Sequence, residues 1–219
     1  MIPTQFAGLE HQLFVWLIAA IRPGAAFLAA PLLGAAFVPV QLRFVLALGV
    51  GVPAAASAGM ALPVDGLVSF QGFALTLGEV MAGLSVGFAV QIGYSAALVA
   101  GEVIGNAMGI GFAAMVDPSS GHSNPVMAQL LSVLSTFLFF AIDGHLILAG
   151  SIIDSYHSLP PGQAWLSYEA INGVVLFGST LFSAGLAIAL PVGFAIILVQ
   201  IVMAMLARSA PQLNLFAVG

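Results

Sequence analysis

Long apolar stretches alternate with short polar segments along the whole chain. They run over residues 13–37, 44–62, 72–108, 126–153 and 170–207. Each approaches or exceeds the roughly 20 residues that a helix needs to cross a bilayer. The sequence therefore predicts an all-α protein of integral membrane type, built of five or six long helices in hydrophobic hairpins and lacking a separate soluble domain.

Proline and glycine mark the expected interruptions. We expect residues 22–24 (Arg-Pro-Gly) to end a helix, and residues 191–193 (Pro-Val-Gly) to be a kink or hairpin point. As one helix, the last stretch would reach about 57 Å, nearly twice a bilayer core of roughly 30 Å. The stretch 72–108 is expected to be one tilted or partly extramembrane helix. Loops are expected over residues 117–125 and 154–168.

Composition supports this assignment and removes several function classes. Hydrophobic residues make up 61% of the 219 residues and charged residues 5%, with a mean hydropathy of +1.16. The formal net charge of -5 provides no basic footprint for nucleic acid. Without cysteine the chain has no disulfides or thiolate ligands. It shows no catalytic triad order, phosphate loop or His-x-x-x-His spacing, so we expect neither an enzyme nor a metal or cofactor. The first ten residues lack secretory signal features, and we expect them to be mature sequence.

Small residues form a stripe along the third apolar stretch. They recur at every fourth position: Ser85, Ala89, Gly93, Ala97, Gly101, Gly105 and Gly109. Such a stripe lets helix backbones approach closely inside a membrane. Gly83 and Gly87 add an offset pair, so we expect this helix to pack on two faces within an assembly. The alternative is that glycine and alanine are simply abundant in this chain.

Ionisable residues within the apolar stretches are candidate functional groups, because charge at bilayer depth is costly. Arg22 either reaches the membrane surface from a helix end broken at Pro23 or pairs with an acid elsewhere, and we favour the first interpretation. Asp143 and His145 do not share a helical face, so we expect packing or interface hydrogen bonds there rather than proton transfer. With Arg208 they complete our set of buried or interface polar residues.

An apolar segment follows the small-residue stripe. Gly109 and Gly111 give the backbone freedom, and apolar residues follow before Asp117 and Pro118. Irregular backbone at membrane depth is tolerated only inside protein or beside a water-filled cavity. From these residues alone, a segment that lines or blocks a passage and a mere linker are equally good interpretations.

Two long motifs carry a resemblance to a known family. Residues 105–118 (GNAMGIGFAAMVDP) and 208–219 (RSAPQLNLFAVG) closely resemble the FliR/SpaR/SctT export-apparatus family of type III secretion systems. Shorter matches follow the family's order over essentially the whole chain, at residues 39–43, 143–145 and 189–191.

The resemblance implies a non-enzymatic subunit of the flagellar protein export gate, in the bacterial inner membrane and flagellar basal body. One copy would assemble with several FliP-like and FliQ-like subunits, and with FlhB-like and FlhA-like subunits, into a gate for unfolded flagellar proteins. Residues 1–125 would form a FliP-like part and residues 126–219 would include the start of a FliQ-like part. The family continues with further hydrophobic helices, so we expect its C-terminal helices to be missing here.

The resemblance also implies that the apolar segment plugs the closed pore. Carried over to this chain, the plug candidates are Gly109, Gly111, Phe112, Met115, Val116, Asp117 and Pro118. The glycines would act as hinges, and the apolar side chains would exclude ions until a substrate displaces them.

Three alternatives stay open. The equivalent subunit of a virulence injectisome shares the mechanism, and the motifs do not separate it sharply from the flagellar version. A small secondary transporter or channel would instead bind solute or protons at Asp143, His145, Glu79 or Glu102. A purely structural membrane scaffold would have no gated pathway.

Overall fold

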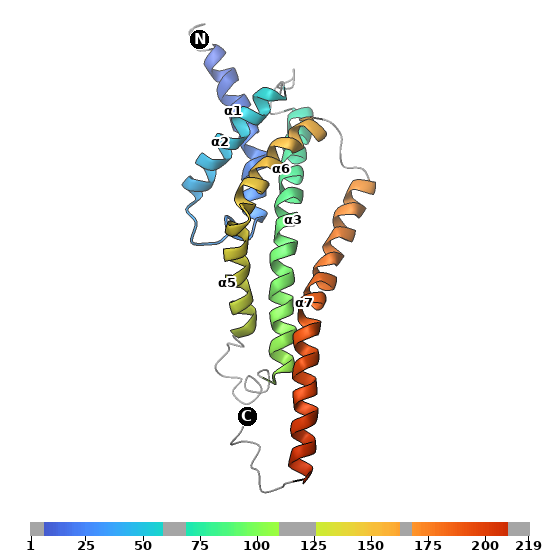
Figure 1. Cartoon of the computed structure of the whole chain (residues 1–219). Helices are drawn as coiled ribbons and strands as arrows, with labels where there is room; N and C mark the ends of the chain where they lie inside the picture. The colour runs from blue at the N-terminus through green and yellow to red at the C-terminus, as the bar shows by residue number, and fades with distance from the viewer. Residues whose placement is uncertain (1–6, 59–68, 110–125, 163–167, 210–219) are drawn as a thin grey trace, which may run out of the picture. The chain divides into compact units, whose positions relative to one another are not determined.

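The computed structural model describes residues 7–58, 69–109, 126–162 and 168–209, and these residues form helices without any strand (Figure 1). This confirms the predicted all-α fold with long apolar helices. The helices are α1 (Ala7–Ala29), α2 (Val40–Ser57), α3 (Phe70–Ala107), α5 (Val126–Ala141), α6 (Gly144–Ser158) and α7 (Tyr168–Ser209).

Four of the described helices, α1, α2, α3 and α7, are long and apolar enough to cross a membrane. α5 and α6 together make a fifth candidate span, bent by 66° at the break between them. The stretch 72–108 forms a single helix, as predicted, with 38 residues.

Proline interrupts the helices less than the sequence predicts. α1 continues through Pro23 and α7 continues through Pro191. The expected helix end at residues 22–24 is therefore wrong, and so is the hairpin alternative at residues 191–193, whereas a kink at Pro191 stays a prediction. A proline removes one intrahelical hydrogen bond but does not reverse the chain. Around Pro191 the sequence is apolar on both sides and offers no polar turn residues.

The fourth apolar stretch forms two helices instead of one. α5 ends at Ala141 and α6 begins at Gly144. Between them Asp143 adopts the left-handed conformation, with φ 55°, which few residues other than glycine tolerate. A Cβ atom on Gly144 would lie 2.5 Å from the Phe139 ring, so only glycine fits where the chain turns. The loop expected from residue 154 also begins later, because α6 extends to Ser158.

The chain divides into two compact units, and α3, α5 and α7 contribute residues to both. The first unit comprises Met1–Ile92 and Thr136–Ser179. The second comprises Gly93–Ser135 and Thr180–Gly219.

The core of the first unit lies between α1, α2 and α6. α1 and α2 form an antiparallel hairpin in which Gly51 lies directly against the carbonyl of Ala19, so that a Cβ atom there would overlap the backbone. The offset glycine pair of α3 makes the same close approach to α1, with Gly83 against the Arg22 carbonyl and Gly87 against the Ala26 carbonyl. The buried core residues are Ala19, Ala20, Ala26, Phe27, Ala30, Ala47, Ala54, Ala55, Leu148, Ile152 and Tyr156.

The second unit packs α3, α5 and α7 around a small core. Its buried residues are Ala100, Ile104 and Ala189, flanked by Met127, Leu131 and Ile196. Within the predicted stripe, Ala97 and Gly101 are buried, Gly105 is half-buried and Gly93 is exposed. Gly101 lies against the backbone of Ala128 in α5, whereas a Cβ atom on Gly93 would meet open space. The stripe therefore packs within this chain over only part of its length.

Candidate functional site

A buried arginine in α1 organises the polar interior of the first unit. Arg22 is 1% exposed, and its partner Glu79 in α3 is equally buried. The guanidinium donates two parallel hydrogen bonds to the carboxylate, from Nε to Oε2 and from Nη2 to Oε1, each 2.9 Å long. This bidentate geometry is the strongest form of the ion pair, and each charge neutralises the other away from water.

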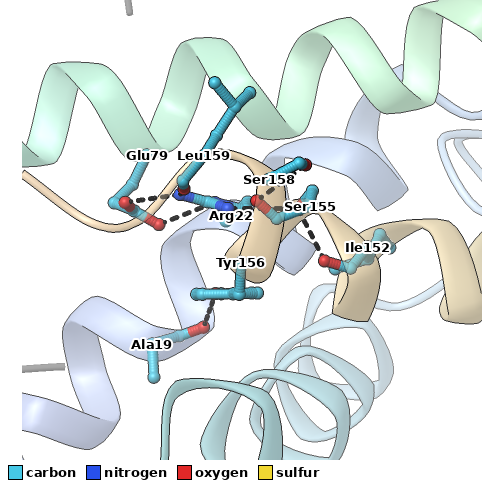
Figure 2. A network of polar contacts seen from close by, with 8 residues as sticks. All are labelled: Ala19, Arg22, Glu79, Ile152, Ser155, Tyr156, Ser158 and Leu159. Carbon is cyan, nitrogen blue, oxygen red and sulfur yellow. Dashed lines mark hydrogen bonds and ion pairs between the residues drawn. The ribbon is translucent and has the colours of Figure 1, made fainter. Parts of the chain in front are cut away.

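The last turn of α6 and the residue that follows it supply two further acceptors to the guanidinium (Figure 2). Nη1 donates to Ser155 Oγ at 3.1 Å, and Nη2 donates a second bond to the carbonyl of Leu159 at 2.9 Å. Ser155 Oγ in turn donates to the carbonyl of Ile152 at 2.6 Å. The Tyr156 ring lies 4.1 Å from the Arg22 Cζ atom, within cation–π range. One side chain thus connects α1, α3 and α6.

Tyr156 also supplies a hydrogen-bond donor that the backbone of α1 lacks. Pro23 has no N–H, so the carbonyl of Ala19, four residues earlier, has no intrahelical donor. The Tyr156 hydroxyl donates to that carbonyl at 2.9 Å, and the tyrosine is fully buried. The same ring that covers Arg22 therefore provides the donor that Pro23 removes, which allows α1 to continue past the proline.

The structure corrects our favoured interpretation of Arg22. The residue does not extend from a helix end toward the membrane surface, because α1 is unbroken and its guanidinium is fully enclosed. The pairing interpretation is the one that holds, with Glu79 as the acid. Ser155, Tyr156 and Leu159 were missed, but Pro23 gave a usable signal, since a proline inside an apolar helix requires a donor from elsewhere.

The ion pair occupies the carboxylate of Glu79. Glu79 already holds a bidentate partner, so it does not offer the free carboxylate that a transporter site would use. Glu102, Asp143 and His145 are exposed in the single chain. Among the described residues no cluster of three or more His, Cys, Asp or Glu side chains is suited to hold a metal ion. The arrangement holds α1, α3 and α6 together.

The other polar candidates lie at the surface of the single chain. Asp143 stands at the break between α5 and α6, and the His145 ring lies 5.7 Å from that of Phe140. Arg208 is exposed in the last turn of α7. Their burial at an interface with another subunit stays a prediction.

Of the plug candidates, the structure describes Gly109. It follows the end of α3 with φ 77°, a left-handed conformation in which glycine commonly terminates a helix. Its N–H donates to the carbonyl of Asn106 at 3.0 Å. The other candidates, at positions 111, 112 and 115–118, lie outside the described residues.

Replacing Arg22 with leucine should destabilise the chain by about 3–5 kcal/mol, because it leaves Glu79 buried without a partner. The double change Arg22→Leu with Glu79→Leu should cost less than Arg22→Leu alone, since neither charge then stays buried. Unfolding free energies of the detergent-solubilised variants measure both effects. Arg208→Leu, which removes an exposed arginine, is the matched control. If the double change cost as much as the sum of Arg22→Leu and Glu79→Leu measured separately, this account would be contradicted.

Tyr156→Phe should cost about 1–3 kcal/mol, because it keeps the ring over Arg22 but leaves the Ala19 carbonyl without a donor. Adding Pro23→Ala restores an N–H in α1, so the same tyrosine change should cost clearly less in that background. A double-mutant cycle on unfolding free energy tests this coupling. Equal costs in both backgrounds would show that Tyr156 does not replace the proline's missing bond.

The chain is similar to known bacterial proteins over most of its length. A family model described as bacterial export proteins, family 1, matches residues 13–219. The flagellar biosynthetic protein FliR of Escherichia coli (strain K12) is 34% identical over 95% of this chain and 78% of its own length. FliR of Pectobacterium carotovorum subsp. carotovorum is 32% identical over 81% of this chain and 68% of its own length. The surface presentation of antigens protein SpaR of Shigella flexneri is 26% identical over 64% of this chain and 54% of its own length. Because the family model spans nearly the whole chain and the first relative matches most of it, this chain belongs to family 1 of the bacterial export proteins, the family of FliR and SpaR.

Proposed function

We propose that this chain is a non-enzymatic core subunit of a flagellar type III protein export gate, through which unfolded flagellar proteins leave the cytoplasm. The observation that carries the proposal is the family match over residues 13–219. The flagellar version is favoured over the injectisome version because two FliR relatives reach 34% and 32% identity, whereas SpaR, at 26%, falls among the more distant FliR relatives, which are 22–27% identical.

Uncovered apolar surface on α7 supports a subunit role. In the apolar span of this helix, residues 171–209, few side chains are buried within the chain. Leu190, Phe194 and Val199 are each more than half exposed. Apolar surface of this extent is stable only against lipid or against other subunits. Small residues such as Gly173, where a Cβ atom would meet open space, leave room for a second helix to approach closely.

The proposed assembly holds one copy of this chain with several FliP-like and FliQ-like subunits, in contact with FlhB-like and FlhA-like subunits. It belongs to the inner membrane part of the flagellar basal body. Residues 1–125 take the place of a FliP-like subunit and residues from 126 onward begin a FliQ-like part. Asp143, His145 and Arg208, exposed in the single chain, are the polar residues we assign to subunit interfaces.

The segment after α3 is the proposed plug of the closed pore. The proposal is supported by the motif of residues 105–118, which resembles the family, and by Gly109, whose left-handed conformation turns the chain out of the helix. Phe112, Met115 and Val116 provide the apolar bulk that excludes ions. Asp117 and Pro118 end the segment, and Gly111 adds a second point of backbone freedom.

The export-gate proposal is tested by co-expressing this chain with FliP-like and FliQ-like subunits from the same organism. Native mass spectrometry of the detergent-extracted species should show a mixed complex with one copy of this chain. Expression of the chain alone is the control. Recovery only as a monomer or homo-oligomer, even with the partners present, would contradict the proposal and make Asp143 and His145 the residues to mutate as transporter candidates.

The plug proposal is tested by deleting residues 110–115. Assembly should be unchanged, because the packed glycines of α3 precede the deletion, whereas cells should become leaky to ions because the apolar bulk is lost. Ion permeability is measured in cells that produce the deletion variant at the level of the unaltered chain. A deletion variant that assembles but leaves ion permeability unchanged would rule out the plug.

A further inference from the structure

One polar side chain stands in a long apolar part of α7. Gln200 is the sole polar residue between positions 184 and 207. Its side chain is exposed in the single chain, on a helix whose apolar surface requires lipid or another subunit against it, and an amide in such surroundings is costly unless it is hydrogen-bonded. The Nε2 atom of Gln200 donates to the carbonyl of Ala107 at 2.7 Å, and this is the one hydrogen bond that its side chain makes to the described residues.

The acceptor is at the C-terminal end of α3. The last carbonyls of a helix have no intrahelical donor, and Ala107 is the final residue of α3. Met108 and Gly109 close the helix with their own N–H groups, which donate to the carbonyls of Ile104 and Asn106. The hydrogen bond from Gln200 therefore connects α7 to the carbonyl of Ala107, two residues before Gly109.

The register of α3 and α7 places Gln200 there. Gly185 lies against the carbonyl of Ala96, and Ala189 packs in one core with Ala100 and Ile104. The two helices thus run parallel within the second unit. Ile196 belongs to the same core, and Gln200 follows it by one helical turn. The interface between α3 and α7 is thus apolar along this core and ends in the hydrogen bond between Gln200 and Ala107.

We propose that Gln200 is a positioning residue that fixes the C-terminal end of α3 against α7. By holding Ala107, it sets the position of Gly109, the residue from which the proposed plug departs. This inference rests on the plug proposal for its consequence in the gate, while the contact itself lies wholly within described residues. A merely structural role would affect stability, whereas a positioning role affects the local accessibility of the helix end and the ion permeability.

The experiment compares Gln200→Met, which keeps the length of the side chain but removes the donor, with Gln200→Asn, which keeps the amide but shortens its reach. Ser183→Ala is the matched control, because within the described part of the chain this exposed α7 hydroxyl bonds only to the carbonyl of Thr180 in its own helix. The reporter is Met108→Cys at a side chain that is 45% exposed, in a chain that has no native cysteine. Maleimide labelling is measured on the assembled complex in membranes, together with recovery of the complex and ion leak.

We expect both Gln200 variants to assemble and to raise the labelling rate at position 108 by about threefold, the scale of one hydrogen bond in a membrane protein. Their ion leak should lie between that of the unaltered chain and that of the 110–115 deletion, and Ser183→Ala should change neither quantity. An unchanged labelling rate in an assembled Gln200→Met complex would overturn the inference, while a leaky deletion variant would still support the plug. A deletion variant that does not leak would overturn the plug and, with it, the role of Gln200 in gating.

Discussion

The structure of the first unit depends on burying one positive and one negative charge together. Neither Arg22 nor Glu79 is tolerable alone inside apolar helices, so each fixes the other in place. Four of the five guanidinium N–H groups have acceptors, drawn from α3 and α6. Because the acceptors stand on different helices, satisfying the arginine also sets the relative placement of α1, α3 and α6 within this unit.

Glycine makes this arrangement sterically possible. Gly83 of α3 lies against the carbonyl of Arg22 itself, one helical turn after Glu79. A larger residue there would move the carboxylate away from the guanidinium. Close backbone approach and the ion pair are therefore two parts of one contact. Gly51 brings α2 equally close to α1 at the carbonyl of Ala19, three residues before Arg22.

The helix content and the third apolar stretch were predictable from the sequence because apolar length and turn residues report directly on single elements. The partner of Arg22 was not, since pairing between residues 57 positions apart depends on packing that no local pattern encodes. Pro23 misled the helix prediction for the same reason, because the donor that compensates it comes from Tyr156, 137 residues from Ala19. The break at Asp143 was also missed. Its apolar flanks resemble a continuous span, and only the crowding of Gly144 against Phe139 shows why the chain turns.

The break between α5 and α6 has a consequence for where this part of the chain resides. A bend of 66° with Asp143 in the left-handed conformation interrupts the regular ladder of peptide hydrogen bonds. Hydrocarbon cannot hydrate peptide groups, so such an interruption is stable only beside water or within a shell of protein. Lipid tails can therefore surround the regular portions of α5 and α6 but not the bend between them, which has to lie beside water or against other protein.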